Sequence, residues 1–300
     1  MNKTIANLSN RPSLSPVKTT IIIPVHNEEE NIGRLLDSLK NIIEDDWEII
    51  VVDDGSGDKT ASVCKEKGVA IISHPYCIGN GAAIKTGIRN ASGNVLVMMD
   101  GDGQHRPEDI PRLLEGIDRY DMVVGARPWR SQSGWSRGLA NRLYNVFASY
   151  VAHKKISDLT SGFRAIKRKI AMKYLYMLPN TFSYPTTLTL GLMKSGHSVS
   201  FVPIEAGKRK GVSKIKPFRD GVRFLLIITR IATVFSPFRV FLPISIFLFL
   251  SGVSYYLYWF FTVGRFTNMA LLLLLLSVIV FLMGLISEQI TQLRYDRTEG

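Results

Sequence analysis

Two carboxylates separated by a single glycine stand directly after an apolar run, in Asp100-Gly101-Asp102. Carboxylates spaced in this way on a turn can share one hard divalent cation. Mg²⁺ and Mn²⁺ are typically held by one or two carboxylates, with phosphate oxygens and water completing the shell. Gly101 lets a ligand approach the backbone closely, and Gln104 follows with a side chain that can orient a ligand or a water molecule. We therefore predict a metal site at Asp100 and Asp102, with Gln104 beside it.

Two other apolar runs also end in polar residues. The run from residue 19 ends in Pro24-Val25-His26-Asn27-Glu28, and the run from residue 48 ends in Asp53-Asp54-Gly55-Ser56. Each ending, taken alone, also fits an ordinary turn or a helix N-cap, because both favour Asp, Ser and Gly. Three such endings within one sheet favour a ligand site over three unrelated turns.

The apolar runs that precede these residues alternate with segments of helical pattern. Runs rich in Val and Ile predict strands at residues 19–25, 48–53, 69–73, 94–99 and 121–125. Helices are predicted near residues 31–43, 58–67, 81–91 and 107–119. This alternation is typical of right-handed βαβ units, which build a mostly parallel sheet with helices on both faces. Such sheets bind ligands at the carboxyl ends of their strands, where all three polar endings would lie.

The C-terminal part of the chain has a different composition. Residues 241–261 and 266–287 carry no charged side chain, and a spanning helix needs roughly 20 apolar residues. Two buried helices of a soluble core are the alternative, but few residues remain to cover them. We predict a transmembrane hairpin with both chain ends cytoplasmic, because Lys and Arg gather before the first span and after the second. The protein would then be an integral membrane protein, of the inner membrane in a bacterium.

The net charge of +12 is concentrated next to the first span. Residues 208–240 contain nine Lys or Arg and one Asp, which accounts for +8 of this total. Arg219, Arg223 and Arg230 fall on one face of a helix, with apolar residues around the rest. We predict a basic amphipathic helix in the membrane interface, with an ordinary surface helix as the alternative. A basic segment beside a span favours anionic lipid over nucleic acid as the partner.

Several other chemistries lack their motifs. There is no Walker A pattern, and Gly79-Asn80-Gly81 lacks the third glycine of a dinucleotide fingerprint. No Cys and His residues have zinc-site spacing. Cys64 and Cys77 are too few for a disulfide scaffold and are expected to be reduced thiols.

Five motifs give the chain a resemblance to a known family. They are residues 23–29, 51–58, 99–105, 158–164 and 211–214. In this order they resemble the motifs of family 2 glycosyltransferases of the GT-A fold. Together with the hairpin, they look like those of membrane-bound polyprenyl-phosphate sugar synthases of the dolichyl-phosphate mannose synthase type. The resemblance implies a GT-A domain followed by an interfacial helix and a transmembrane hairpin.

The resemblance also implies roles for single residues. The nucleotide sugar would be bound by Pro24, His26, Glu28, Asp53, Asp54, Asp100, Gly101, Asp102, Gln104 and Arg127. The metal on its diphosphate would be held by Asp100, Asp102 and Gln104. The acceptor and phosphate groups would be held by Arg137, Arg164, Arg209, Ser213 and Lys214. Asp102 and Asp158 are the expected catalytic residues, with Asp158 positioning the acceptor rather than serving as an obligatory base. Two residues depart from the family pattern: His26 stands where relatives often have tyrosine, and Asn80 where many have lysine.

The expected function is inverting, metal-dependent sugar transfer with Mg²⁺ or Mn²⁺ as cofactor. A UDP- or GDP-linked sugar would pass to undecaprenyl or dolichyl phosphate, giving a lipid-linked sugar for envelope glycans or protein glycosylation. A processive polysaccharide synthase and an inert nucleotide-sugar-binding membrane scaffold stay open as alternatives. The expected organisation is a flexible arm at 1–18, a cytoplasmic catalytic domain at 19–207, the basic segment at 208–240, the two spans and a cytoplasmic tail at 288–300. A homo-oligomer is compatible with this organisation.

Overall fold

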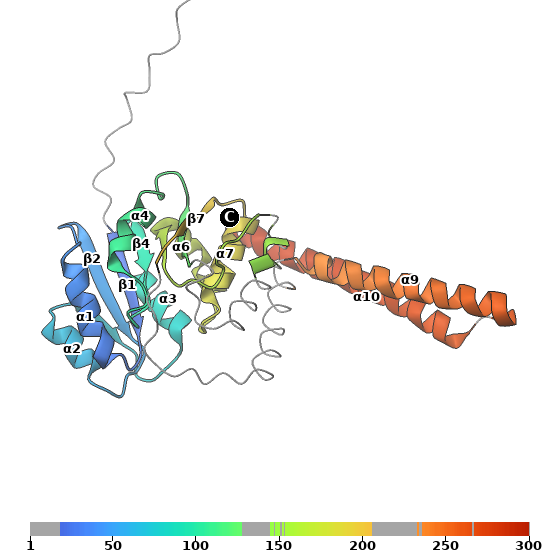
Figure 1. Ribbon diagram of the computed structural model, residues 1–300, viewed down its shortest axis with the longest axis horizontal. Helices are drawn as coiled ribbons and strands as arrows, with labels where there is room; N and C mark the ends of the chain where they lie inside the picture. Colours follow the sequence, from blue (N-terminus) through green and yellow to red (C-terminus); the bar gives the residue numbers. More distant parts are fainter. Residues whose placement is uncertain are drawn as a thin grey trace, which may run out of the picture.

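The computed structural model describes residues 19–127, 145–146, 148–150, 152, 154–205, 233, 236–265 and 267–299. They form an α/β domain from which two long helices extend side by side (Figure 1). The arm at 1–18, most of the basic segment at 208–240, and the residues Arg137, Arg209, Ser213 and Lys214 lie outside the described residues. The interfacial helix therefore stays a prediction.

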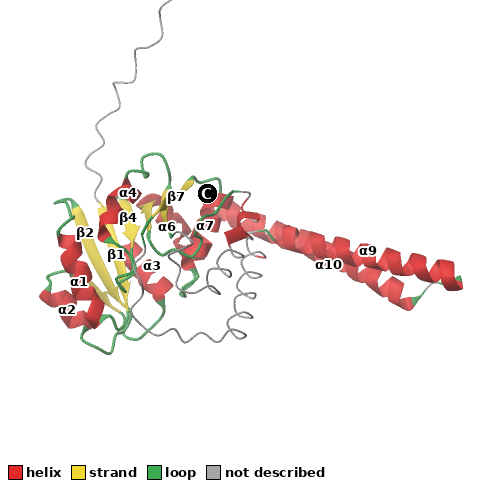
Figure 2. Cartoon of the chain, viewed as in Figure 1, coloured by secondary structure: helices red, strands yellow, loops and turns green. Residues whose placement is uncertain are grey.

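One seven-stranded sheet forms the centre of the domain (Figure 2). Its strands are β1 (Thr19–Val25), β2 (Trp47–Asp53), β3 (Ala70–Ser73), β4 (Val95–Met98), β5 (Met122–Ala126), β6 (Arg164–Lys167) and β7 (Val199–Pro203). Their order is β3-β2-β1-β4-β6-β5-β7, and only the two pairs that involve β6 are antiparallel. The predicted mostly parallel sheet is confirmed. β6 and β7 were not predicted, because their short sequences contain polar residues and lack an apolar run.

Helices cover both faces of this sheet. One face carries α1 (Glu29–Lys40), α2 (Thr60–Glu66) and α4 (Ile110–Leu114), and the other carries α3 (Asn80–Asn90), α6 (Arg168–Tyr174) and α7 (Tyr184–Lys194). Ile21 and Ile23 of β1 belong to the first core and Ile22 to the second, and all three are fully buried. A strand that is apolar at every position is therefore what this two-sided burial requires.

The fourth predicted helix is shorter than its pattern indicated. It begins as a 3₁₀ turn at Pro107–Asp109 and continues as α4, which ends at Leu114. Gly116 follows two residues later, and glycine is an unfavourable residue inside a helix. The close approach of the chain to β5 also requires this glycine, because a Cβ there would lie 2.7 Å from Val123 Cγ2.

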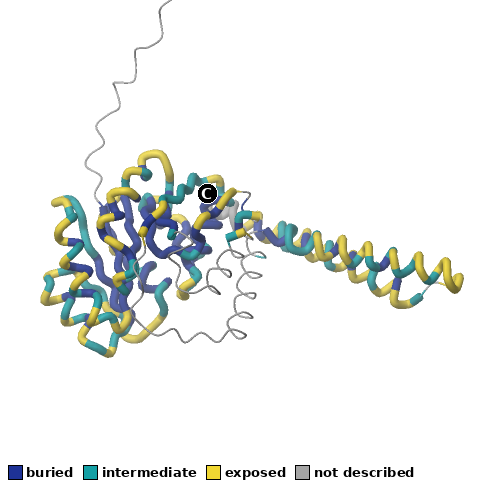
Figure 3. Tube along the Cα trace, viewed as in Figure 1, coloured by how far each residue is buried: buried dark blue, intermediate teal, exposed yellow. Residues whose placement is uncertain are grey.

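The two C-terminal helices are α9 (Pro237–Val263) and α10 (Asn268–Glu299). α9 contains the whole first predicted span, whereas α10 begins at Asn268, two residues after the predicted start of the second; each helix is longer than its charge-free segment. Gly264 ends α9 in the left-handed conformation, with φ of 69°, and the hydroxyl of Ser245 donates a hydrogen bond of 2.9 Å to the carbonyl of Ser277 in α10. Both helices are long and apolar enough to cross a membrane, and few of their described residues are buried (Figure 3). The hairpin thus has the surface expected of a segment in contact with lipid.

Asp121 connects the amino ends of β5 and β7, and we expect it to stabilise the domain. Its carboxylate accepts hydrogen bonds from Ser198 N at 3.0 Å, His197 Nδ1 at 3.2 Å and Lys167 Nζ at 3.3 Å. Burial acts to raise the pKa of Asp121, but these hydrogen bonds outweigh it and lower the pKa from 3.8 to about 2. We expect Asp121→Asn to lower the free energy of unfolding at pH 7 by about 1–2 kcal/mol.

The stabilisation by Asp121 should depend on pH with a defined sign. Because the pKa is lower in the folded protein, the stabilisation is present above pH 4 and is lost as the pH falls from about 4 towards 2. Urea unfolding of both proteins in detergent at pH 7 and pH 3 measures the effect. Asp37→Asn, which removes an exposed ion pair with Lys67, is the control. An equal difference between wild type and variant at both pH values would contradict the prediction.

Candidate active site

The carboxyl ends of β1 and β4 open into a pocket of about 490 Å³. Its walls contain Pro24, Val25, His26, Glu28, Asp54, Cys77, Gly79, Asn80, Ala83, Asp100, Gly101, Asp102, Gln104 and Phe182. Eight of these are residues that the sequence singled out for the nucleotide sugar. The three polar strand endings therefore do meet at one edge of the sheet, as parallel topology requires.

Hydrogen bonds between the loops after β1 and β2 hold one side of the pocket in place. Asn27 N donates to Ser56 Oγ at 2.9 Å, and Gly57 N donates to Asn27 Oδ1 at 2.9 Å. Asn27 itself has a φ of 55°, a conformation that asparagine tolerates better than most residues. His26 Nδ1 lies 2.9 Å from the carbonyl oxygen of Asp54, so this nitrogen carries the proton and donates. The exposed imidazole ring of His26 is thus held at the wall of the pocket.

Asp54 uses its carboxylate to shape the loop that follows β3. It accepts hydrogen bonds from His74 Nδ1 at 2.8 Å, Ile78 N at 3.0 Å and Gly79 N at 2.7 Å. Although burial acts to raise the pKa of Asp54, these bonds and one from the Cys77 thiol lower it overall. Its oxygens are therefore already engaged within the protein. Asp54 lines the pocket chiefly as an organiser of its wall.

Asp53 lies behind the pocket wall. Its side chain is buried and accepts a hydrogen bond of 3.0 Å from Ser56 N. This bond holds the Asp-Gly-Ser turn at the end of β2. Asp53 is absent from the residues that line the pocket, so a contact with the nucleotide stays a prediction for this residue.

Asp100 and Asp102 both face the pocket, and the backbone around them is closely packed. Gln104 N donates to Asp102 Oδ1 at 3.1 Å, which holds the turn. A Cβ at Gly101 would lie 2.5 Å from Val25 Cγ1, so glycine is required for the turn to pass the end of β1. A Cβ at Gly162 would lie 2.6 Å from Asp100 Oδ2, so the carboxylate rests directly against the Gly162 backbone.

His105 supports this turn from inside the domain. Its ring stacks on Phe163 with centroids 5.0 Å apart, and its Nδ1 accepts a hydrogen bond of 3.3 Å from Asp100 N. Burial lowers the pKa of His105, against the opposing effect of the charges on Asp100 and Asp102. A neutral imidazole that accepts through Nδ1 is therefore the form that fits this position.

The donor set at Asp100 and Asp102 fits a hard divalent cation. Both residues present carboxylate oxygens, and the Gln104 side chain lines the same pocket. Among the described residues, no group of three or more His, Cys, Asp or Glu side chains could hold a metal ion without further ligands. The arrangement thus fits an ion such as Mg²⁺ or Mn²⁺, whose remaining ligands come from a bound phosphate and water.

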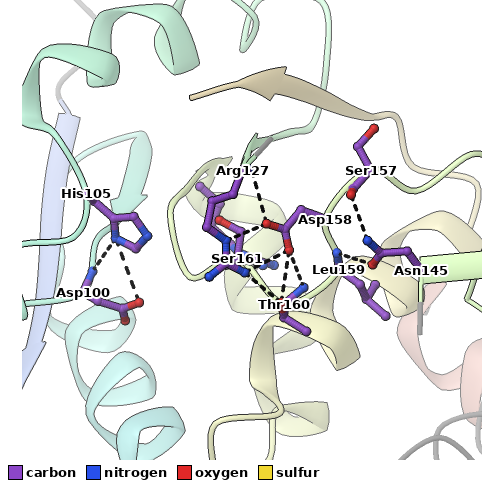
Figure 4. A network of polar contacts seen from close by, with 10 residues as sticks. Asp100, His105, Arg127, Asn145, Ser157, Asp158, Leu159, Thr160 and Ser161 are labelled. Atoms are coloured by element: carbon purple, nitrogen blue, oxygen red, sulfur yellow. Dashed lines mark hydrogen bonds and ion pairs between the residues drawn. The ribbon is translucent and has the colours of Figure 1, made fainter. Parts of the chain in front are cut away.

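Asp158 forms a buried ion pair with Arg127, as Figure 4 shows. Arg127 donates to Asp158 through Nε at 2.7 Å and Nη2 at 3.1 Å, and Thr160 donates to the same carboxylate through its N and Oγ1, both at 3.1 Å. Burial acts to raise the pKa of Asp158, but Arg127 and Thr160 lower it below its usual range. A carboxylate with this many donors is a weak base.

The charge of Arg127 interacts with Asp100 and Asp102 as well as with Asp158. Burial acts to lower the pKa of its guanidinium, but Asp158 outweighs burial and raises it, and the charges of Asp100 and Asp102 add to this increase.

Asn145 holds the loop that contains Asp158, because its Nδ2 donates to Ser157 O at 2.9 Å and its Oδ1 accepts from Leu159 N at 3.1 Å (Figure 4).

The structure corrects the expected role of Arg164. Arg164 begins β6 and has no exposed surface, whereas a residue that binds an acceptor phosphate must reach solvent. Its guanidinium instead donates to Pro185 O at 3.0 Å and Thr189 Oγ1 at 3.2 Å, and also to Ser161 O. The motif 158–164 therefore ends inside the core, where Arg164 connects the Ser161 turn to α7 through hydrogen bonds.

Six pocket residues were not predicted as site residues, namely Val25, Cys77, Gly79, Asn80, Ala83 and Phe182. Cys77, Gly79 and Asn80 lead into α3, where a Cβ at Gly79 would lie 2.3 Å from Asn180 O. The glycines around Asn80 gave a sequence signal for such close packing. Phe182 stands just before α7 and is 81% exposed, and no motif distinguishes it.

Comparison with known proteins places the chain in a family. The model of glycosyl transferase family 2 matches residues 20–175, and the model of the GtrB C-terminal hairpin matches residues 236–293. The chain belongs to glycosyl transferase family 2 and is an enzyme of the glycosyltransferase class. Its two apolar C-terminal helices fit a membrane protein.

Individual proteins agree with this assignment. Polyprenol monophosphomannose synthase of Mycolicibacterium smegmatis is 31% identical over 66% of this chain and 81% of that protein. Undecaprenyl-phosphate 4-deoxy-4-formamido-L-arabinose transferase of Proteus mirabilis is 32% identical over 56% of this chain and 57% of that protein. The structure of glucosyl-3-phosphoglycerate synthase from Mycobacterium tuberculosis with Mn²⁺ and UDP has a TM-score of 0.59 at 17% identity, over 74% of this chain and 85% of that chain. This last likeness shows a GT-A-like fold.

Proposed function

We propose that this glycosyltransferase moves a sugar from a UDP- or GDP-linked donor to a polyprenyl phosphate in a membrane. The observation that carries the proposal is the presence, on one chain, of the Asp100 and Asp102 pocket and an apolar hairpin. The paired carboxylates of the pocket can bind a diphosphate-linked sugar through a divalent cation. The hairpin can hold the enzyme at the membrane in which a lipid acceptor lies. The names of two relatives, a polyprenol monophosphomannose synthase and an undecaprenyl-phosphate sugar transferase, support the same acceptor class.

The pocket would bind the donor through its diphosphate. Asp100 and Asp102, with Gln104 beside them, would hold Mg²⁺ or Mn²⁺. When bound, such an ion offsets the negative charge that develops on the departing nucleoside diphosphate. The ring of His26 and the side chain of Pro24 give the pocket a wall on which a nucleobase can pack. A Mn²⁺ ion in a fold neighbour is consistent with this assignment.

The chemical step would be a single displacement at the anomeric carbon. An oxygen of the lipid phosphate forms the new bond to carbon, while the bond to the diphosphate breaks and its electron pair leaves with the nucleoside diphosphate. A phosphate monoester is largely ionised near pH 7, because its second pKa is about 6. No strong general base is then needed, which agrees with an Asp158 carboxylate that is saturated by donors. In-line attack inverts the configuration of the sugar.

The proposed topology places the catalytic domain and both chain ends in the cytoplasm. The clustering of Lys and Arg before the first span supports this orientation. The described part of α9 begins with Pro237, Phe238 and Arg239, so one cation lies at the foot of the hairpin, where lipid phosphates would be. Arg239 Nη1 donates to Tyr150 O and thereby connects the hairpin to the domain.

A donor and acceptor panel tests the proposal directly. Purified full-length protein in detergent is offered radiolabelled UDP- and GDP-sugars with undecaprenyl phosphate or dolichyl phosphate. We expect one donor to label the lipid fraction, and we expect EDTA to stop the reaction until Mg²⁺ or Mn²⁺ is added back. Labelling of a growing water-insoluble polymer, or of no lipid by any donor, would contradict the proposed acceptor.

Removal of the hairpin should separate lipid access from chemistry. A chain ending at Val240 keeps only the first four residues of α9 and lacks α10, but it keeps every described residue of the pocket. We expect it to retain transfer to a short, water-soluble prenyl phosphate and to lose transfer to undecaprenyl phosphate in vesicles. The thermal unfolding midpoint of the truncated chain serves as the control for folding. Equal loss on both acceptors in a folded protein would show that the hairpin supports the site itself.

A further inference from the structure

Arg164 is a cation that is enclosed in the domain beside the pocket. None of its surface is exposed, and its guanidinium donates to the oxygens of Ser161, Pro185 and Thr189 and to the sulfur of Met122. None of these is a carboxylate. A buried arginine is usually paired with an acidic residue, because an unpaired charge is costly to bury. The stability of the core therefore does not by itself explain why this arginine is buried here.

The two Nη atoms of the Arg164 guanidinium hold two segments that lie next to the pocket. Nη2 donates to Ser161 O, in the turn whose next residue, Gly162, lies directly under the Asp100 carboxylate. Nη1 donates to Pro185 O in the first turn of α7, three residues after Phe182 on the pocket wall. Arg164 thus bridges the turn that supports Asp100 and the start of α7, which follows the pocket residue Phe182.

The charge of Arg164 also acts on the site. Asp100 and Asp158 are the carboxylates whose negative charges act on its guanidinium. With Arg127 bound to Asp158, Arg164 is a second cation behind the two acidic residues. It does not occupy the space in which a cation or a phosphate would bind, because its side chain is fully buried.

We propose that Arg164 is a positioning residue for the metal site, acting through the Ser161–Gly162 turn on the carboxylate of Asp100. The inference rests on the proposed role of Asp100 as a metal ligand. A planar guanidinium can donate to two segments at once, whereas a lysine ammonium at the same place reaches fewer acceptors and a methionine reaches none. The guanidinium geometry and its charge therefore both contribute.

Binding of Mn²⁺ to the full-length protein in detergent tests the proposal without turnover. Electron paramagnetic resonance of free Mn²⁺, in the presence of UDP or GDP, measures the dissociation constant. We expect Arg164→Met to weaken Mn²⁺ binding by about 10-fold or more. We expect Arg164→Lys to be intermediate, because the lysine ammonium restores part of the interaction. Thr189→Val removes one partner of Arg164 but leaves Pro185 O and the Ser161 contact, and we expect it to bind Mn²⁺ as the wild type does.

A double-mutant cycle tests whether Arg164 acts on Asp100 through the Ser161–Gly162 turn. Gly162→Ala forces a Cβ against the Asp100 carboxylate and should weaken Mn²⁺ binding directly. If Arg164 acts through this turn, Arg164→Met adds less in the Gly162→Ala background than in the wild type. Full additivity, or unchanged Mn²⁺ affinity in a folded Arg164→Met protein, would overturn the proposal. Where Arg164→Met does not fold, the same cycle with Arg164→Lys decides it.

The experiment separates this inference from the proposed function. Failure of the wild-type protein to bind Mn²⁺ would remove the metal site itself. Normal Mn²⁺ binding by the wild type, together with unchanged binding by both Arg164 variants, would remove only the role of Arg164. The thermal unfolding midpoint, measured without Mn²⁺, distinguishes a general loss of stability from a local change at Asp100.

Discussion

Asp102→Asn should lower turnover by about 10³-fold while the protein remains folded. The variant keeps an oxygen that can accept the hydrogen bond from Gln104 N, so the turn at the end of β4 is preserved. It loses one of the two carboxylates that would hold the cation, and with it the charge that makes the site attractive to Mg²⁺ or Mn²⁺. A metal contributes several kcal/mol to such a step, and about 4 kcal/mol corresponds to a factor of about 10³ in rate.

Initial rates of lipid labelling at several Mn²⁺ concentrations measure this effect. We expect the variant to need far more Mn²⁺ and to remain slow at saturation. Asp37→Asn, on the exposed face of α1, loses a carboxylate in the same way and should keep wild-type turnover. An Asp102→Asn protein that keeps more than a tenth of the wild-type rate would contradict the metal site.

Asp158→Asn should reduce both turnover and stability. The substitution leaves the half-buried guanidinium of Arg127 without its anionic partner, and breaking a buried ion pair costs about 3–5 kcal/mol. Arg127 stands between Asp158 and the charges of Asp100 and Asp102, so its displacement disturbs the pocket. A misplacement of about 1 Å can lower a rate by about 10²-fold. We therefore expect turnover to fall by about 10²-fold and the unfolding midpoint to fall with it.

The pH dependence distinguishes positioning from base catalysis. The pKa of Asp158 is held below its usual range, so the residue is ionised throughout the range from pH 5 to 9. Its titration should therefore contribute no limb to the wild-type pH–rate profile in this range. The double variant Arg127→Met with Asp158→Asn should recover stability but not turnover, because the unpaired charge is gone. A wild-type limb near pH 6 that disappears in Asp158→Asn would identify Asp158 as a base.

The local patterns of the sequence determined the first half of the fold and much of the pocket. Apolar runs of Val and Ile marked β1 to β5, because a strand covered on both faces must be apolar at every position. Parallel topology then required their polar endings to meet, and eight of the expected residues do line one pocket. The hairpin could equally be predicted from the sequence, because a bilayer sets both the length and the polarity of a spanning helix.

The tertiary structure alone decided which polar groups are still available to a ligand. Asp54 and Asp158 look like free carboxylates in the sequence, yet both accept hydrogen bonds from donors in distant segments. Arg164 looks like a phosphate ligand, yet β6 inserts antiparallel between β4 and β5 and carries it into the core. These outcomes depend on contacts between segments far apart in the chain, whereas a sequence pattern reports only the chemistry of each segment and its local periodicity. The sequence therefore determined the kind of site, and packing determined the role of each charge within it.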